Sequence, residues 1–137
     1  MTTFQLHENL ARDTVPVADW TLSRVLLMND ANYPWLILVP RRDGLRDFHD
    51  LSAEDLPVMT AEIVDASHAL RDLFDAHKLN VAALGNQVPQ LHFHVIARTT
   101  DDPAWPKPVW GAAPAVPYEK DALDARLASL REAFARF

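Results

Sequence analysis

The sequence predicts an α+β domain in which two β-hairpins flank a long helix and a second helix ends the chain. Two pairs of apolar, strand-like segments are each joined by a segment rich in turn formers, which is typical of hairpins. The stretch between the pairs repeats apolar residues every three or four positions, as a helix with one buried face does. A similar repeat closes the chain. We expect one domain over residues 1–137, because this length is ordinary for a single domain.

The first hairpin joins residues 20–28 to residues 35–39. The first of these segments begins with alternating polarity and ends apolar, and the second is apolar throughout. Residues 29–34 between them are dense in turn formers, so antiparallel pairing is expected. Residues 14–18 are predicted to form an edge strand, where Pro16 is tolerated.

The long helix is predicted to begin just after Ser52 and to run to about His77. Ser52 and Asp55 have the spacing of a helix-capping pair. The residues of the apolar stripe follow at helical steps and are Leu56, Met59, Ile63, Ala66, Leu70, Leu73 and Phe74.

The second hairpin joins residues 80–84 to residues 90–98 through a turn over 85–89. Glycine and asparagine in this turn tolerate positive φ, which suits a chain reversal. The turn brings Asn86 and Gln87 beside the start of the last strand. Their side-chain amides and backbone N–H groups are then available to a phosphate.

Residues 99–118 are predicted to be an irregular loop rich in proline and tryptophan. A loop of this length is usually functional or disordered, and two tryptophans argue against disorder. Trp105 and Trp110 either pack the loop onto the sheet edge or a second subunit, which we favour, or line a base pocket. A helix over about 121–137 carries the last apolar stripe, which comprises Leu123, Leu127, Leu130, Phe134 and Phe137.

Three alternate residues of the last predicted strand, Gln90, His92 and His94, share one face of it. Leu91, Phe93, Val95 and Ala97 share the other face and are expected in the core. Side chains two positions apart on a strand lie roughly 7 Å apart, so both imidazoles can reach one phosphate or one metal ion. The alternative is that the histidines are simply polar residues on the wet face of a half-buried sheet.

Charge and composition exclude some classes of function. The formal net charge of −6 argues against a nucleic-acid-binding module. A small anion remains possible, because Arg41, Arg42 and Arg46 form a local basic cluster, unless these are only solvated surface charges. The chain has no cysteine, which excludes disulfides, thiolate zinc sites and a cysteine nucleophile. Without a signal-peptide pattern or a long apolar run, we expect a cytoplasmic protein that does not enter the membrane.

The histidine segment resembles the signature of the histidine-triad (HIT) superfamily, in which three histidines alternate with apolar residues. Gln90 stands in the first position, His92 in the middle and His94 in the last, and the resemblance makes these three the expected catalytic residues. The resemblance covers a core of about residues 14–98 and implies an antiparallel sheet of about five strands. It is greatest to small bacterial members with glutamine first and a Trp-Pro-rich tail, which are commonly labelled diadenosine-tetraphosphate hydrolases. Family members are commonly homodimers. Asp43 is a second departure, since many relatives have histidine there.

The resemblance implies that His92 attacks the α-phosphate of a nucleotide and forms a nucleotidyl-histidine that water hydrolyses. His94 would hydrogen-bond the phosphate or the entering water, and no metal or other cofactor is required. Asn29 matches a position that helps to hold the nucleoside, and Gln87 stands where the family often has serine or threonine. The expected substrate-binding residues are Asn29, Asn86, Gln87 and Arg98.

Three hypotheses remain open. The first is a nucleotide hydrolase or nucleotidyl transferase that acts through His92 on a nucleotide or dinucleotide. The second is a nucleotide-binding protein with little turnover, because the Gln90 amide cannot shuttle a proton at neutral pH. The third is a metalloenzyme in which His92 and His94 are ligands, although a third ligand is not evident nearby.

Overall fold

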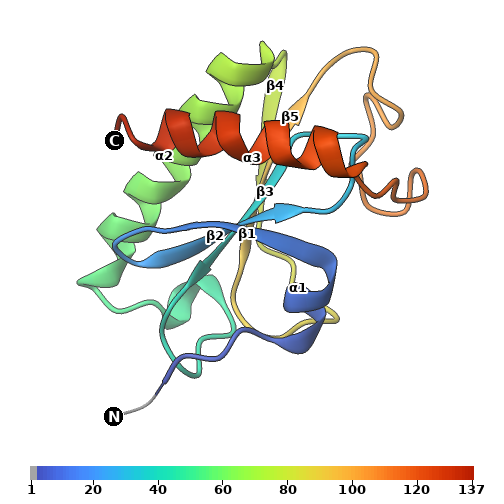
Figure 1. The fold of residues 1–137 in the computed structure, drawn as a ribbon. Coiled ribbons are helices and arrows are strands. Elements are labelled where there is room, and N and C mark those ends of the chain that lie inside the picture. The colour runs from blue at the N-terminus through green and yellow to red at the C-terminus, as the bar shows by residue number, and fades with distance from the viewer. Residues whose placement is uncertain (1–2) are drawn as a thin grey trace.

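A five-stranded antiparallel sheet lies at the centre of the computed structural model, which describes residues 3–137 (Figure 1). Its strands lie side by side in the order β1-β2-β3-β5-β4. The α+β class and the five antiparallel strands expected from the sequence are confirmed. The strands are β1 (Thr14–Asp19), β2 (Ser23–Met28), β3 (Trp35–Pro40), β4 (Lys78–Ala82) and β5 (Phe93–Arg98). The helices are α1 (Glu8–Asp13), the short 3-10 helix η1 (Phe48–Asp50), α2 (Asp55–Phe74) and α3 (Lys120–Phe134).

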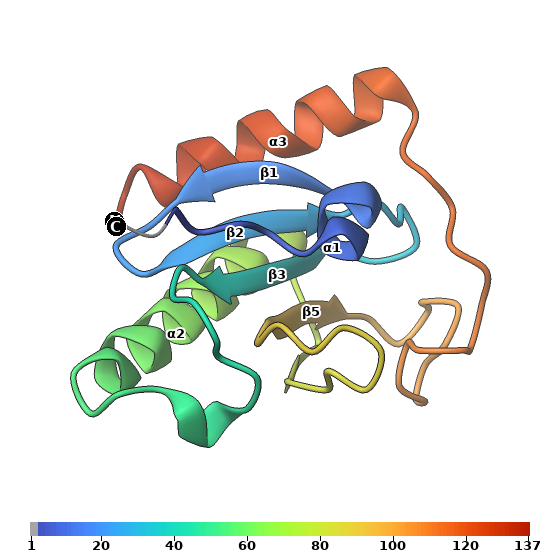
Figure 2. The ribbon, with the colours of Figure 1, turned by 90° about the horizontal axis from the view of Figure 1, so that it is seen from below.

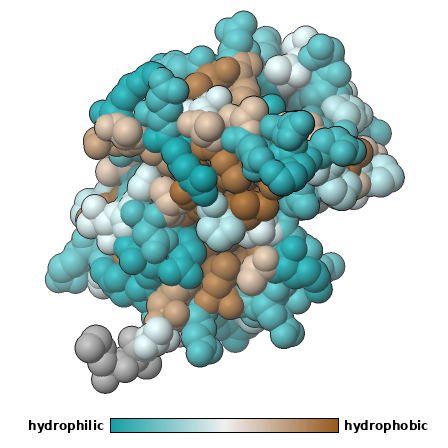
Figure 3. All heavy atoms as spheres, viewed as in Figure 1, coloured by the Kyte–Doolittle hydropathy of each residue, from teal (hydrophilic) through white to brown (hydrophobic). Residues whose placement is uncertain are grey.

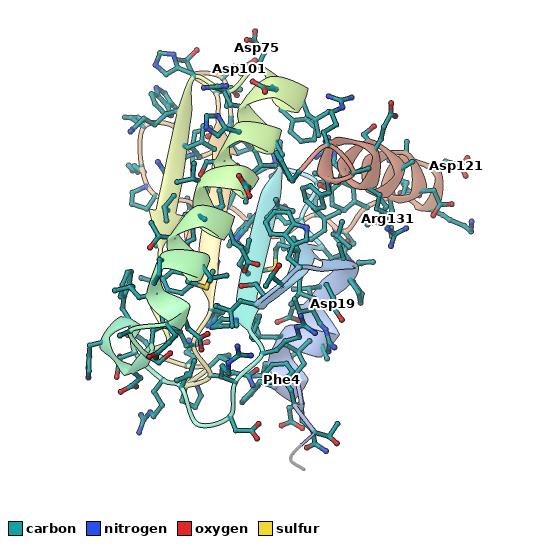
Figure 4. All side chains as sticks on the ribbon, turned by 90° about the vertical axis from the view of Figure 1, so that its left-hand side faces the viewer. Phe4, Asp19, Asp75, Asp101, Asp121 and Arg131 are labelled. Atoms are coloured by element: carbon teal, nitrogen blue, oxygen red, sulfur yellow. The ribbon has the colours of Figure 1, made fainter. Side chains whose placement is uncertain are left out.

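Helices α2 and α3 cover one face of the sheet. This face carries the larger apolar core, which contains Leu91, Phe93, Val95 and Ala97 as the alternation predicts. Helix α3 runs alongside the edge strand β1 (Figure 2). Arg131 of α3 faces that strand (Figure 4) and donates to the backbone oxygens of Val17 and Pro16, at 3.0 and 3.1 Å.

The opposite face of the sheet is also covered. Leu10 of α1 and Ala104 and Val109 of the loop after β5 pack there against buried residues of the sheet such as Ile37 and Ile96. The alternative of a solvent-exposed face for the histidines is therefore wrong. Helix α1 did not follow from the sequence pattern, since its six residues bury a single apolar side chain, Leu10.

Several element boundaries differ from the sequence predictions. Strand β2 begins at Ser23, because the Trp20 N–H donates to the Ser23 carbonyl and closes a turn there. Strand β4 lies two residues earlier than predicted, at Lys78–Ala82. Strand β5 begins only at Phe93, so that Gln90 and His92 precede it. Helix α2 ends at Phe74, because Asp75 adopts a left-handed conformation with φ of 49° that caps the helix.

The two hairpins meet where β3 pairs with β5. Ile37 lies opposite His94 in this pairing, and Trp35 lies opposite Ile96. Because β5 is paired with β3 on one side and β4 on the other, it is an inner strand held by both neighbours. Hydrogen bonds on both sides therefore hold the backbone that positions the side chains of β5.

The face shown in Figure 3 is mainly hydrophilic, with apolar residues gathered towards its middle. None of the helices within residues 3–137 has both the length and the apolar character that crossing a bilayer requires.

Candidate active site

His92 lies just before β5 and His94 is its second residue, and both are on the face opposite the larger core. Both side chains are largely buried, with 6% and 5% of their surface exposed. Their rings meet edge to face with centroids 5.0 Å apart. The two imidazoles are therefore held together in a space from which most water is excluded.

The His92 ring has one nitrogen engaged and one free. Its Nδ1 lies 2.7 Å from the backbone carbonyl oxygen of Gln90, so Nδ1 carries the proton and Nε2 has the lone pair. This is the backbone hydrogen bond that a nucleophilic imidazole needs. Burial lowers the pKa of His92, the Gln90 carbonyl partly opposes that effect, and the charge of His7 lowers the pKa further. His92 is therefore neutral and nucleophilic near pH 7.

The His94 ring has the opposite tautomer. Nε1 of Trp35 donates to Nδ1 of His94 at 3.0 Å, which leaves the His94 proton on Nε2. Burial, with a smaller contribution from His92, lowers the pKa of His94 to about 3. His94 is thus a neutral hydrogen-bond donor through Nε2. Sequence reasoning missed this role of Trp35, although Trp35 and Ile37 share a face of β3 and Ile37 lies opposite His94.

The Gln90 side chain holds the N-terminal segment. Its Oε1 accepts from the backbone N–H of His7 at 2.8 Å, and its Nε2 donates to the backbone oxygen of Gln5 at 2.9 Å. The side-chain amide thus accepts with its oxygen and donates with its nitrogen, as a backbone peptide group does in a sheet. Gln90 therefore anchors the segment that leads into α1, and this geometry gives no support to the catalytic contact that the resemblance implies for its side chain.

A cavity of about 330 Å³ opens beside the two histidines. Asn86 and Gln87 line it together with both imidazoles, as the second predicted hairpin required. Asn9 and Asp13 of the N-terminal segment also line it, and no sequence pattern indicates a role for these two. The remaining wall is largely apolar and comprises Leu10, Met28, Trp35, Ile37, Leu84, Gly85, Val88 and Trp110.

The two tryptophans of the loop after β5 have different surroundings. Trp110 lines the cavity and packs edge to face on His94, with centroids 5.1 Å apart. Trp105 packs instead against Arg98 and His77. The structural role that we favoured for both fits Trp105, whereas Trp110 belongs to the wall of the cavity.

Asn29 lines a neighbouring hollow of about 480 Å³ rather than the histidine cavity itself. The two spaces share Asp13, Met28, Trp35 and Trp110. The Asn29 Oδ1 accepts from the backbone N–H of Tyr118 at 2.9 Å. Asn29 therefore ties the segment before α3 to the end of β2, and its amide nitrogen is left to donate to a ligand.

Arg98 lies away from the histidine cavity. It is 1% exposed, and its guanidinium donates to Asp102 at 2.7 and 3.1 Å, to Asn80 and to the Lys107 carbonyl. These contacts fix the loop after β5 and leave Arg98 no exposed surface for a substrate. The sequence interpretation of Arg98 as a substrate-binding residue is replaced by a structural one.

Possible metal ligands meet elsewhere in the described chain. Donor atoms of Asp47, His49 and Asp50 lie within 4.8 Å of one another, and all three residues are exposed. Asp50 already accepts the backbone N–H groups of Arg46 and Asp47. Neither His92 nor His94 belongs to this group, and each of them has Nδ1 engaged with the protein.

The fold and the paired histidines agree with what is found among known proteins. The family model of the HIT domain matches residues 11–101. The chain belongs to the HIT family. No curated protein matches it significantly.

Several solved structures are similar over nearly the whole chain. A histidine triad protein from Marinobacter aquaeolei VT8 is 46% identical, with a TM-score of 0.95 and 98% of each chain covered. One from Bradyrhizobium japonicum is 43% identical, with a TM-score of 0.94 and coverage of 96% of this chain and 98% of that one. One from Sinorhizobium meliloti 1021 is 42% identical, with a TM-score of 0.94 and coverage of 97% and 98%.

Proposed function

We propose that the protein is a nucleotide hydrolase or nucleotidyl transferase that acts on the α-phosphate of a nucleotide conjugate or dinucleoside polyphosphate through His92. The observation that carries this proposal is the hydrogen bond from His92 Nδ1 to the Gln90 carbonyl. It fixes the neutral tautomer with its lone pair on Nε2, which is the atom that must attack phosphorus. Membership of the HIT family supports nucleotide chemistry of this kind.

The reaction proceeds in two displacements. The Nε2 lone pair of His92 forms a bond to the α-phosphorus, and the bond from that phosphorus to the leaving group breaks with its electron pair. The product is a nucleotidyl-imidazolium whose Nδ1–H still donates to the Gln90 carbonyl. Water, or another acceptor in the transferase case, then displaces the imidazole and gives up one proton to solvent. During both steps His94 donates from Nε2 to a phosphoryl oxygen and stabilises its charge.

The cavity provides for the rest of the nucleotide. Asn86 and Gln87 lie on the loop beside the histidines and can donate amide N–H groups to the phosphate. Met28, Trp35 and Trp110 form an apolar wall against which a base can pack. Asp13 also lines this cavity. Each of its carboxylate oxygens accepts one hydrogen bond from Arg12 and has a further lone pair that can accept from a ribose hydroxyl.

We further propose the homodimer that the family resemblance implies. Strand β4 forms one edge of the sheet, and Val81 on it has 48% of its surface exposed. An open edge with an apolar side chain is a surface that a second sheet can cover. Light scattering coupled to gel filtration is expected to give twice the chain mass of 15.4 kDa, and a monomer at micromolar concentration would contradict the proposal.

A second candidate is a nucleotide-binding protein with little turnover. The observation that favours it is the use of the Gln90 amide to anchor the N-terminal segment, which leaves two histidines in the row where the family signature has three. Acid–base help from one group typically contributes about 10²–10⁴-fold to a rate. Saturable nucleotide binding without product formation is the result that this candidate expects.

Intact-protein mass spectrometry after rapid quenching without acid tests the proposal. Wild type and His92→Ala are mixed with activated nucleotides or dinucleoside polyphosphates for milliseconds to seconds. We expect an added nucleotidyl mass on wild type alone, together with product that His92→Ala does not form. Turnover by His92→Ala at the wild-type rate would overturn the mechanism. Binding without adduct or product from either protein would favour the second candidate.

A further inference from the structure

His92 lines two cavities, of which the one beside Asn86 and Gln87 is the proposed nucleotide site. The second has a volume of about 220 Å³ and lies between the loop that leads into η1 and the loop that leads into β5. It shares Leu84, Gly85 and His92 with the first cavity. A phosphorus atom placed at His92 would therefore have open space on both sides of the imidazole.

Arg46 is the cation of this second cavity. The three arginines of the basic cluster differ in what they contact. Arg41 donates to the backbone oxygens of Trp20 and Leu22, and Arg42 forms an ion pair with Asp55 at 2.9 Å. The Arg46 guanidinium makes no hydrogen bond or ion pair within residues 3–137, and only its backbone N–H is engaged, with Asp50. A free guanidinium beside a phosphate-binding imidazole can bind a second anion.

Two acids, Asp47 and Asp50, lie near Arg46 in the sequence, and neither forms a hydrogen bond or ion pair with its guanidinium within residues 3–137. Asp50 accepts the backbone N–H groups of Asp47 and Arg46 at 2.9 and 3.2 Å, and these hydrogen bonds lower the pKa of its carboxyl. The Asp50 carboxylate therefore stabilises the start of η1 through these two hydrogen bonds. Asp47 is the acid that lines the cavity, and the exposed ring of His49 lines it too. The lining therefore has one carboxylate and one guanidinium that are not paired with each other.

Apolar side chains border the cavity on both loops. Phe48 and Leu84 line it and have 50% and 48% of their surface exposed. An exposed phenyl ring next to a free guanidinium suits a group that has phosphate at one end and a flat or apolar part at the other. The first cavity, at about 330 Å³, is the larger of the two and adjoins the hollow at Asn29.

We propose that the second cavity binds the leaving group of the substrate, and that this leaving group carries phosphate. The inference rests on the proposed function and narrows its substrate class to nucleotide anhydrides such as dinucleoside polyphosphates. When His92 Nε2 bonds to the α-phosphorus, the bridging oxygen leaves with the electron pair as part of a phosphate anion. Arg46 stabilises that anion through charge-assisted hydrogen bonds. No proton transfer is needed in this step.

Two substrates with the same nucleotidyl group test this assignment. One has a phosphate-bearing leaving group, as in a dinucleoside polyphosphate, and the other an uncharged one, as in a nitrophenyl ester of the nucleotide. We expect Arg46→Ala to lower kcat/KM about 10-fold or more for the first and less than about 2-fold for the second. The matched control is Arg42→Ala, which removes an arginine whose guanidinium is paired with Asp55 outside the cavity. Equal losses with both substrates, or no loss with either, would overturn the assignment.

A binding measurement separates failure of the subsite from failure of the proposed function. If wild type turns over neither substrate, the reaction is wrong, but calorimetric titration with inorganic pyrophosphate still tests the cavity. Binding that Arg46→Ala weakens about 10-fold or more and Arg42→Ala leaves intact supports an anion subsite. Equal pyrophosphate binding by all three proteins, or no binding by wild type, would overturn it.

Discussion

The indole N–H of Trp35 donates a hydrogen bond to Nδ1 of His94 over 3.0 Å. The two residues lie on neighbouring strands and 59 positions apart in the sequence. Because an indole nitrogen can only donate, the contact requires a His94 ring that is unprotonated at Nδ1. A residue outside the histidine motif thus determines which nitrogen of His94 carries the proton.

Trp35→Phe removes this donor and keeps an aromatic ring. We expect kcat to fall roughly 10-fold, because orienting partners of functional imidazoles have effects of about this size and His94 can then adopt either tautomer. Nitrogen-15 chemical shifts of the His94 ring should show a mixture of tautomers. The control is Trp110→Phe, since Trp110 also packs on His94 but makes no hydrogen bond to it. A wild-type nitrogen spectrum in Trp35→Phe would contradict the assignment.

The low pKa of His94 predicts that the fold loses stability in mild acid. Its folded pKa is about 3, below the ordinary value of 6.5, so between these values the unfolded chain binds a proton that the folded protein does not. The free energy of unfolding should therefore fall with decreasing pH, by about 1.4 kcal/mol per pH unit below pH 6.5 for this residue alone. The stabilisation is fully present above pH 6.5.

Urea unfolding at pH 7.5 and pH 5.0 measures this dependence. His94→Gln cannot titrate in this range, so its stability should change less between the two pH values than that of wild type. His68→Gln is the control, because His68 is exposed on α2 and should leave the wild-type dependence intact. An identical pH dependence in wild type and His94→Gln would show that folding does not lower the pKa of His94.

Gln90→Leu removes both hydrogen bonds to the N-terminal segment. We expect the free energy of unfolding to fall by about 1 to 3 kcal/mol, since the Gln5 oxygen and the His7 N–H lose their partner. Amide hydrogen exchange at His7 should become faster. Gln90→His should behave similarly, because one imidazole ring cannot reproduce both contacts of the amide. Increased activity in Gln90→His with an unchanged exchange rate at His7 would instead favour a catalytic role for this position.

Arg98→Met should destabilise the protein by about 3 to 5 kcal/mol, because it leaves Asp102 unpaired with 6% of its side chain exposed. Thermal or urea unfolding measures the loss. The control is Arg71→Met, which removes an ion pair between exposed side chains and should change stability by less than about 1 kcal/mol. At a temperature where Arg98→Met is folded, its KM should equal that of wild type. A raised KM without loss of stability would return Arg98 to the substrate-binding residues.

The periodic parts of the chain were predictable from sequence. Alternation placed Phe93 and Val95 in the core and His92 and His94 on the opposite face, because a strand has only two faces. The turn before β5 was short enough to place Asn86 and Gln87 at the histidine cavity. The family resemblance supplied chemistry that these periodicities do not contain.

The contacts that complete the site were not predictable in this way. Helix α1 has six residues and one buried side chain, which is too little pattern to recognise. Gln90 and Arg98 are residue types that often bind substrates. Their hydrogen-bond partners are instead Gln5 and His7 for Gln90 and Asp102 for Arg98, which lie in irregular segments that the sequence pattern does not place. A strand's periodicity indicates which face a side chain occupies and does not indicate what will cover that face.

The N-terminal segment has a consequence for the order of folding. The two Gln90 hydrogen bonds span 83 and 85 positions of the sequence. They hold the N-terminal segment against a loop that is made much later in synthesis. Contacts of such separation carry a large loop-closure cost and are expected to form after local structure. The wall that Asn9 and Asp13 contribute lies beside both histidines only once β5 has joined the sheet. During synthesis, a newly made chain would therefore acquire its other elements before it acquires a complete site.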